Sequence, residues 1–202
     1  MKAVGEFSWL LSFDDEEEPK ANERARRVAA LLHGLKPEGL VEAVPAARSV
    51  FVEGSPSFDA GILVGLEAGR LDAPAPEAGE HEIRVTLDGE DLPEVSGALG
   101  LSPEAFGESL LAASFTVGFL GFSPGFAYLY GLPARLRRPR RRTPRLSVPA
   151  GSLAMAGPYV GIYPASIPGG WNLLGTVDAV LFDPERQPPV LFAPGDTVRF
   201  RR

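Results

Sequence analysis

The sequence predicts an α+β protein built from two modules, a mixed N-terminal unit followed by an all-β unit. Its 202 residues are enough for one large domain or two small ones. Apolar residues recur at strand and helix spacing up to about residue 112, but beyond Phe115 only short apolar runs between turns remain. The 23 Gly and 20 Pro are denser in this later part, so we expect it to be rich in turns and strands.

The N-terminal unit is expected to follow the order β-α-β-β-α-β. Helical spacing of Ala25, Val28, Leu31 and Leu32 indicates an amphipathic helix that ends at Gly34. The expected elements are a strand over 4–13, a helix over 19–32, a hairpin over 40–47 and 49–53, a helix from Ser57 to residue 66, and a strand over 81–87. This order is typical of a ferredoxin-like unit, in which both helices cover one face of an antiparallel sheet.

The second unit begins with two short helices, over 91–99 and 102–112. Ser102 as N-cap and Pro103 at the first helical position mark the start of the second helix. Short strands separated by turns indicate a closed barrel or a sandwich, and they are expected over 115–122, 153–155, 159–163, 172–174, 179–182, 190–192 and 197–200. The Pro- and Ala-rich stretch 71–80 is the expected linker, which gives domains over 1–80 and 81–202.

Charge is unevenly distributed along the chain. Residues 1–118 hold 22 acidic and 9 basic residues, whereas residues 119–202 hold 4 acidic and 11 basic ones. The opposite net charges of these two stretches suggest that the chain has two modules. Cysteine is absent, which excludes disulfides, thiolate nucleophiles and Cys-based metal sites. With only His33 and His81 present, the sequence also argues against a His-rich metal site, and no metal ligand is assigned.

The sequence predicts neither a membrane-spanning helix nor a secretory signal. Its apolar runs are shorter than the roughly 18 residues of a membrane-spanning helix. The N-terminus has one Lys, a short apolar stretch interrupted by polar residues and then an acidic run, which is the wrong order for a secretory signal. We therefore expect a soluble, cytoplasmic protein without membrane contact.

Segment 121–133 is the first of three with unusual composition. Pro124 and Gly125 form a turn between Phe122 and Phe126, and Tyr128 follows closely. Aromatic faces and phenol hydroxyls around such a turn can wall a ligand pocket. A tight corner of the barrel would explain the same residues.

Segment 134–152 contains seven Arg and no acidic residue. Pro139, Pro144 and Pro149 exclude a continuous helix, so the arginines lie on an extended loop. The guanidinium fork suits carboxylate or phosphate, which favours a small anionic ligand. A solvated loop that docks on an acidic partner is an alternative. Nucleic acid is disfavoured, because aromatic residues are not interleaved with the arginines and the chain is acidic.

Segment 161–175 combines a Pro168-Gly169-Gly170 turn with Trp171. A turn without side chains lets the backbone approach a ligand closely, although a hairpin with a core tryptophan fits equally well. The nucleotide-binding patterns GxGxxG and GxxxxGK[ST] are both absent.

Together these segments resemble subunit 1 of the allophanate-hydrolase-like carboxyltransferase family. The matching runs are GFLGFSPGFAYLYGLP, RRPRRRTPRLSVPAGSLAMAG, GIYPASIPGGWNLLGTVDAVLFDP and PPVLFAPGDTVRF, and VEAVPAARSVFV resembles the hairpin of the family's first domain. The family includes KipI-type kinase inhibitors and one of the subunits of bacterial 5-oxoprolinase. The resemblance implies a ferredoxin-like domain followed by a cyclophilin-like β-barrel.

The resemblance also implies a function. It suggests a subunit that works with a second, KipA-like subunit in the ATP-dependent opening of the 5-oxoproline lactam, with ATP as co-substrate and magnesium as its counter-ion. The isolated chain is then expected to be inactive. A KipI-like inhibitor of a sensor histidine kinase is the alternative.

Cationic groups are the natural catalysts for a reaction that develops negative charge on oxygen, at about 3–4 kcal/mol for each well-placed donor. We therefore assign catalysis first to Arg145 and second to Arg140. A covalent serine is disfavoured because no histidine lies near it in the sequence. The expected substrate-binding residues are Pro124, Gly125, Phe126, Tyr128, Pro149, Gly151, Ser152, Tyr163, Gly169, Gly170 and Trp171.

Overall fold

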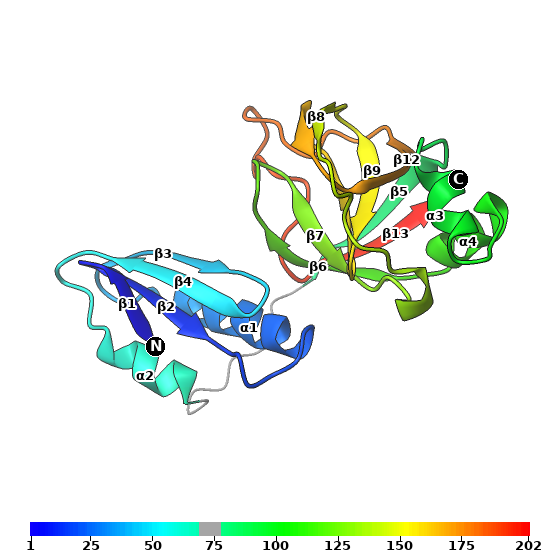
Figure 1. Ribbon diagram of the computed structural model, residues 1–202. Helices are drawn as coiled ribbons and strands as arrows, with labels where there is room; N and C mark the ends of the chain where they lie inside the picture. The colour runs from blue at the N-terminus through cyan, green and yellow to red at the C-terminus, as the bar shows by residue number, and fades with distance from the viewer. Residues whose placement is uncertain (69–77) are drawn as a thin grey trace. The chain divides into compact units, whose positions relative to one another are not determined.

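The computed structural model describes residues 1–68 and 78–202, so most of the predicted linker over 71–80 lies outside the described residues. The chain divides into two compact units, residues 1–77 and 78–202 (Figure 1). Among the described helices, none is long and apolar enough to cross a membrane.

The N-terminal unit is a four-stranded antiparallel sheet in the order β1-β2-β4-β3. Its strands and helices are β1 (Lys2–Gly5), β2 (Ser8–Ser12), α1 (Lys20–Leu35), β3 (Leu40–Pro45), β4 (Ser49–Gly54) and α2 (Gly61–Glu67). Helix α1 packs against β3 and β4. Its apolar stripe, which includes Ala25 and Leu32, meets Leu11, Val50 and Val52 in one core, as the helical spacing predicted.

Several boundaries in this unit differ from the prediction. The strand expected over 4–13 is a hairpin of β1 and β2, because the chain turns after Gly5. Helix α1 runs through Gly34 and ends at Leu35, and the next residue, Lys36, adopts a left-handed φ of 47°. Ser57 does not cap α2; instead the Gly61 N–H donates to Asp59 Oδ1 at 2.8 Å.

The sixth element of the expected β-α-β-β-α-β order was wrongly placed. Strand β5 (Glu80–Thr86) belongs to the second unit, where it pairs with two barrel strands. The N-terminal sheet is completed by β1 at its edge instead. Local alternation identified β5 as a strand, but its partners lie up to about 120 residues further along the chain.

The second unit contains a closed seven-stranded barrel in the order β10-β7-β6-β13-β5-β12-β9. The strands are β6 (Phe115–Leu120), β7 (Ala127–Tyr130), β9 (Ser152–Ala156), β10 (Tyr159–Ile162), β12 (Asn172–Val177) and β13 (Thr197–Arg201), together with β5. A separate pair joins β8 (Arg145–Val148) to β11 (Ile167–Gly169). Most of the buried apolar residues of this unit form one core that includes Phe106, Phe115 and Phe192. A second, smaller cluster contains Phe126 and Tyr163.

Two helices pack on the barrel, α3 (Leu92–Gly97) against β12 and α4 (Pro103–Leu111) against β13. The Ser102 cap of α4 is confirmed, because its hydroxyl accepts from the Ala105 N–H at 3.2 Å. The strands expected over 179–182 and 190–192 reduce to one isolated bridge between Phe182 and Val190. Conversely, β7 and β8 were not predicted as strands, because their sequences were interpreted as pocket and loop segments.

Candidate functional site

Aromatic side chains from segments 121–133 and 161–175 line a pocket of about 220 Å³ in the second unit. We call it the aromatic pocket. Tyr128 comes from β7, Gly169 from β11, and Trp171 directly precedes β12. The lining residues are Phe122, Phe126, Tyr128, Arg140, Pro144, Tyr163, Pro168, Gly169, Gly170 and Trp171. All three segments singled out in the sequence therefore meet at one site.

Phe126 fixes the aromatic walls. Its ring is 1% exposed and makes edge contacts with Tyr128, Tyr163 and Trp171 at centroid distances of 5.2, 5.3 and 5.3 Å. Tyr128 in turn stacks on Phe119 at 4.3 Å. Edge-to-face and stacked rings at these distances hold one another in place. The pocket is thus walled by aromatic rings whose positions are set by their neighbours.

Gly169 and Gly170 in the 168–170 turn differ in what a side chain at each position would contact. A Cβ on Gly169 would overlap the Tyr163 hydroxyl oxygen, so only glycine fits there. A Cβ on Gly170 would lie 3.2 Å from Arg140 Nη2, the end of a flexible side chain. Gly169 therefore allows the turn to approach the phenol, and Gly170 lies beside the guanidinium.

Both tyrosines of the pocket are neutral phenols at physiological pH. Burial raises the pKa of Tyr128, and burial likewise raises the pKa of Tyr163, where a hydrogen bond to the Trp171 backbone opposes the effect. A buried phenol is harder to ionise because its phenolate would lose hydration. These side chains can orient a ligand through hydrogen bonds but do not serve as bases near neutral pH.

Arg140 is the charged residue of the aromatic pocket. Within residues 1–68 and 78–202, neither an ion pair nor a side-chain hydrogen bond is formed by its guanidinium. Its backbone position is nonetheless fixed on both sides. Asn172 Nδ2 donates to the Pro139 carbonyl at 3.0 Å, and the Arg141 N–H donates to the Gly170 carbonyl at 2.8 Å. Arg140 therefore offers an uncommitted cation from an anchored loop.

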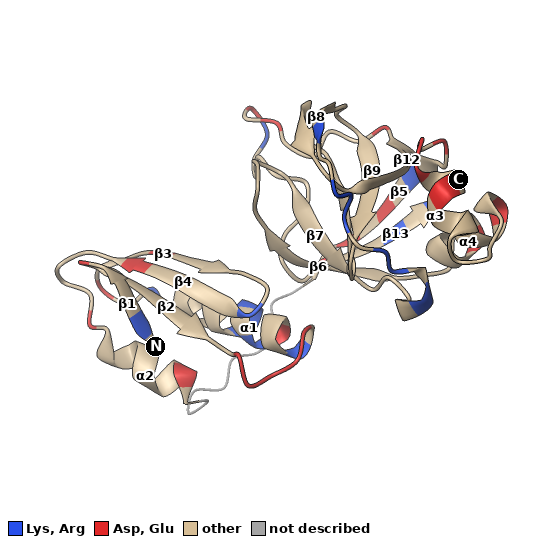
Figure 2. Ribbon diagram, in the orientation of Figure 1, with Lys and Arg blue, Asp and Glu red and all other residues tan. Residues whose placement is uncertain are grey.

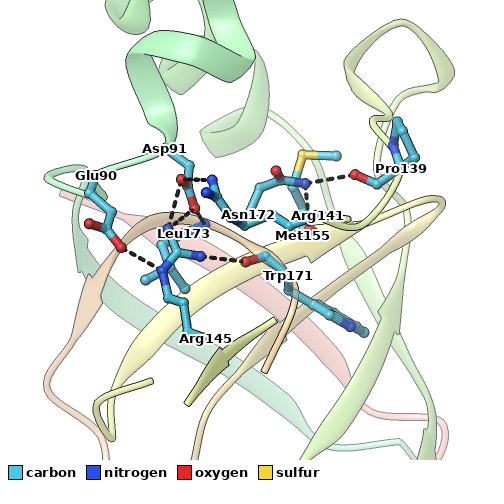
Figure 3. Close-up of polar contacts among 9 residues, drawn as sticks. All are labelled: Glu90, Asp91, Pro139, Arg141, Arg145, Met155, Trp171, Asn172 and Leu173. Carbon is cyan, nitrogen blue, oxygen red and sulfur yellow. Dashed lines mark hydrogen bonds and ion pairs between the residues drawn. The ribbon is translucent and has the colours of Figure 1, made fainter. Parts of the chain in front are cut away.

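Arg145, the first choice from the sequence, is already paired (Figure 3). Its Nη2 donates to both oxygens of Asp91 at 2.8 and 2.9 Å, and its Nε donates to Glu90 Oε1 at 2.6 Å. The Arg145 side chain is 19% exposed and does not line the aromatic pocket. Burial would lower its pKa, but the bonds to Asp91 and Glu90 prevail and raise it. Arg145 thus joins β8 to the segment before α3.

Asp91 is the residue that sequence reasoning missed. It directly precedes α3, its side chain is 5% exposed, and it also accepts hydrogen bonds from Arg141 and from the Leu173 N–H. The adjacent acidic residues 90 and 91 before a short helix were the available signal. Because these acidic residues and the arginine loop that they pair with both belong to the second unit, the change of charge near residue 118 does not coincide with the boundary between the units, which follows residue 77.

Five expected binding residues do not line the aromatic pocket. Gly125 packs closely against Leu181 and Phe182, and a Cβ on Gly151 would lie 2.7 Å from the Val177 carbonyl oxygen. The Gly151 N–H donates to the Tyr163 carbonyl at 2.8 Å, which holds the loop between β8 and β9 against the barrel. These turns therefore shape the corners of the barrel. The five residues outside the pocket lining are Pro124, Gly125, Pro149, Gly151 and Ser152.

Comparison with known proteins defines the class of this chain. Residues 1–192 match the family model for the carboxyltransferase domain, subdomain C and D. The chain belongs to this family.

Two curated relatives extend over nearly the whole chain, and both are the B subunit of a 5-oxoprolinase. The relative from Escherichia coli O157:H7 is 38% identical over 204 residues, covering 98% of this chain and 93% of the relative. The relative from Bacillus subtilis (strain 168) is 33% identical over 220 residues, covering 100% and 92%. Among solved structures, TTHA0988 is 43% identical with a TM-score of 0.84; 96% of this chain matches 39% of that longer chain.

Proposed function

We propose that this chain is the B subunit of a 5-oxoprolinase and that its aromatic pocket binds the lactam. The observation that carries the proposal is Arg140, a cation without an intramolecular partner among the described residues, at the wall of a small aromatic pocket. The full-length relatives bear the name of this enzyme component, which favours it over the kinase-inhibitor alternative. We further propose that the N-terminal unit is a ferredoxin-like variant and that the barrel is cyclophilin-like.

The shape and chemistry of the pocket suit 5-oxoproline. Its volume of about 220 Å³ is below the ~300–1,000 Å³ of drug-sized sites, so it suits a single small ring. The flat lactam would lie against the wall formed by Tyr128 and Trp171, whose rings contact each other edge to face at a centroid distance of 5.5 Å. The Arg140 guanidinium would pair with the carboxylate, and the neutral Tyr163 phenol would orient the amide.

The pocket lacks the groups that hydrolysis requires. Its lining contains no His, Asp, Glu, Lys, Ser or Cys, so it has neither a general base nor a nucleophile. The described residues also include no group of three His, Asp or Glu that could hold magnesium. The chain would therefore bind and orient substrate, while a second subunit completes the catalytic site.

The proposal is tested by lactam binding to the full chain, followed through Trp171 fluorescence in a Trp9→Phe background. We expect 5-oxoproline to bind and 2-pyrrolidone, which lacks the carboxylate, to bind more weakly. Arg140→Ala should weaken 5-oxoproline binding roughly ten- to a hundred-fold, equivalent to about 1.5–3 kcal/mol for a charge-assisted hydrogen bond. Arg140→Lys, which keeps the charge but removes the fork, should fall between.

The matched control is Arg135→Ala. Arg135 belongs to the same segment, lies in a 3₁₀ helix over Ala134–Leu136, is exposed, and donates to the Ser109 hydroxyl at 3.1 Å outside the pocket. Equal loss in the two alanine variants, or no loss in either, would remove Arg140 from the substrate site. Lactam-dependent ATP hydrolysis should require the co-purified second subunit. Robust turnover by this chain alone would refute the proposal that the second subunit completes the catalytic site.

A further inference from the structure

A second concavity adjoins the aromatic pocket and is lined by arginines. Its volume is about 390 Å³, and Arg140 belongs to its lining as well as to that of the aromatic pocket. We call it the arginine groove. Its lining residues are Glu94, Val95, Arg138, Pro139, Arg140, Arg141, Arg142, Thr143 and Asn172. Figure 2 shows the basic residues along the chain that leads into β8.

Three of these arginines have no compensating charge. Arg141 is committed to Asp91, but Arg138, Arg140 and Arg142 form no ion pair or side-chain hydrogen bond within the described parts of the chain. Glu94, the acidic residue of the lining, makes no ion pair within 4 Å of them either. Like charges gathered around one concave surface repel each other until an anion enters. The groove is therefore electrostatically incomplete.

The arginine backbone is held in place before any ligand arrives. The Gly157 N–H donates to the Arg138 carbonyl at 2.6 Å, which fixes the start of the segment to the turn between β9 and β10. The contacts of Pro139 and Arg141 described above fix the next positions to the segment that leads into β12. Binding to an anchored loop costs less ordering entropy than binding to a mobile one. This separates the groove from an ordinary solvated basic loop.

We infer that the arginine groove binds the phosphate groups of a phosphate-bearing ligand. Guanidinium forks pair with phosphate oxygens through two parallel hydrogen bonds, and the groove presents three of them around one volume. Thr143 also lines the groove and adds a hydroxyl to it, whereas the Asn172 amide nitrogen is committed to the Pro139 and Met155 carbonyls. The phosphate site is inferred from the groove alone. Only its placement beside the lactam, with Arg140 shared between the two sites, rests on the proposed function.

The test uses the full chain and tripolyphosphate as the probe, by calorimetry and by ³¹P NMR at fixed ionic strength near 0.15 M. Arg138→Ala/Arg142→Ala should weaken tripolyphosphate binding at least ten-fold. The matched control is Arg135→Ala/Arg199→Ala, which removes the same two charges from exposed positions of the same unit outside the groove. We expect the control to bind within about two-fold of the wild type. Unchanged circular dichroism and thermal midpoint establish that both variants fold.

The outcomes separate the sources of phosphate. ATP binding as tightly as tripolyphosphate indicates a site that recognises phosphates alone; tighter ATP binding that 5-oxoproline competes away indicates that the nucleotide also enters the aromatic pocket. Inorganic phosphate binding as tightly as either indicates a single-phosphate site.

Three results overturn the inference: no tripolyphosphate binding, equal loss in the two double variants, or citrate binding as tightly as tripolyphosphate. If tripolyphosphate does not bind but an acidic peptide does, the groove is a protein-docking surface. Tripolyphosphate is titrated without lactam, so this result and the lactam result can fail independently.

Discussion

Replacing Asp91 with alanine should destabilise the barrel by about 3 kcal/mol. The Asp91 carboxylate accepts from Arg145 through both oxygens, from Arg141, and from the Leu173 N–H at 2.7 Å. Removing one partner of a buried ion pair costs about 3–5 kcal/mol, because the remaining charge is left uncompensated. Arg145 and Arg141 retain 19% and 35% side-chain exposure, so water can partly solvate them and the lower end applies.

The assay is urea unfolding of the full chain. The two tryptophans fall one in each unit, Trp9 in the first and Trp171 in the second, so a Trp9→Phe background reports on the barrel. With a slope of about 1–3 kcal/mol per M urea, a loss of about 3 kcal/mol lowers the midpoint by roughly 1–3 M. Asp91→Asn keeps the volume of the side chain and one acceptor, and should give an intermediate loss.

Glu90→Gln is the matched control. Glu90 also pairs with Arg145 but is 64% exposed, and an exposed ion pair contributes about 0–1 kcal/mol. A loss below about 1 kcal/mol for Asp91→Ala, or a loss equal to that of Glu90→Gln, would refute the view that the buried carboxylate holds the arginine loop.

Two further predictions concern the aromatic pocket. Gly169→Ala places a Cβ against the Tyr163 hydroxyl and should lower the free energy of unfolding in urea by about 1–3 kcal/mol. The control is Gly97→Ala in α3, where a Cβ would have nothing within 4 Å, and it should be neutral or stabilising by up to about 1 kcal/mol. Similar losses in the two variants would contradict the clash. Burial raises the pKa of Tyr163 in the folded state above its unfolded value of about 10, so above that pH the unfolded chain loses the phenol proton more readily than the folded chain does. Stability should therefore fall above about pH 10, and less steeply in Tyr163→Phe; identical pH slopes would count against it.

Features fixed by neighbouring residues were predictable from the sequence. The buried stripe of α1 and the Ser102 cap of α4 depend on contacts within a few positions. The pairing of β5 was not predictable in the same way, because alternation identifies a strand and is silent about its partners. The sheet assignment of β5 therefore failed although its boundaries were nearly correct.

The same distinction applies to the candidate site. Aromatic and glycine-rich segments attracted attention by their own composition, and they do converge on one pocket. The choice between Arg145 and Arg140 depended on Asp91, which lies 54 and 49 positions away and left no periodic trace in the sequence. A pattern reveals which side chains can bind anions, but only the fold reveals which of them already have one.

The position of β13 has a consequence for how the molecule is made. This strand, over Thr197–Arg201, lies between β5 and β6, parallel to the first and antiparallel to the second. During synthesis from the N-terminus, β5 and β6 therefore have a vacant place between them until residues 197–201 emerge. The N-terminal sheet can form early, while the barrel waits with two open edges. Over that interval the nascent chain exposes two unpaired strand edges, which are sites where another chain can pair.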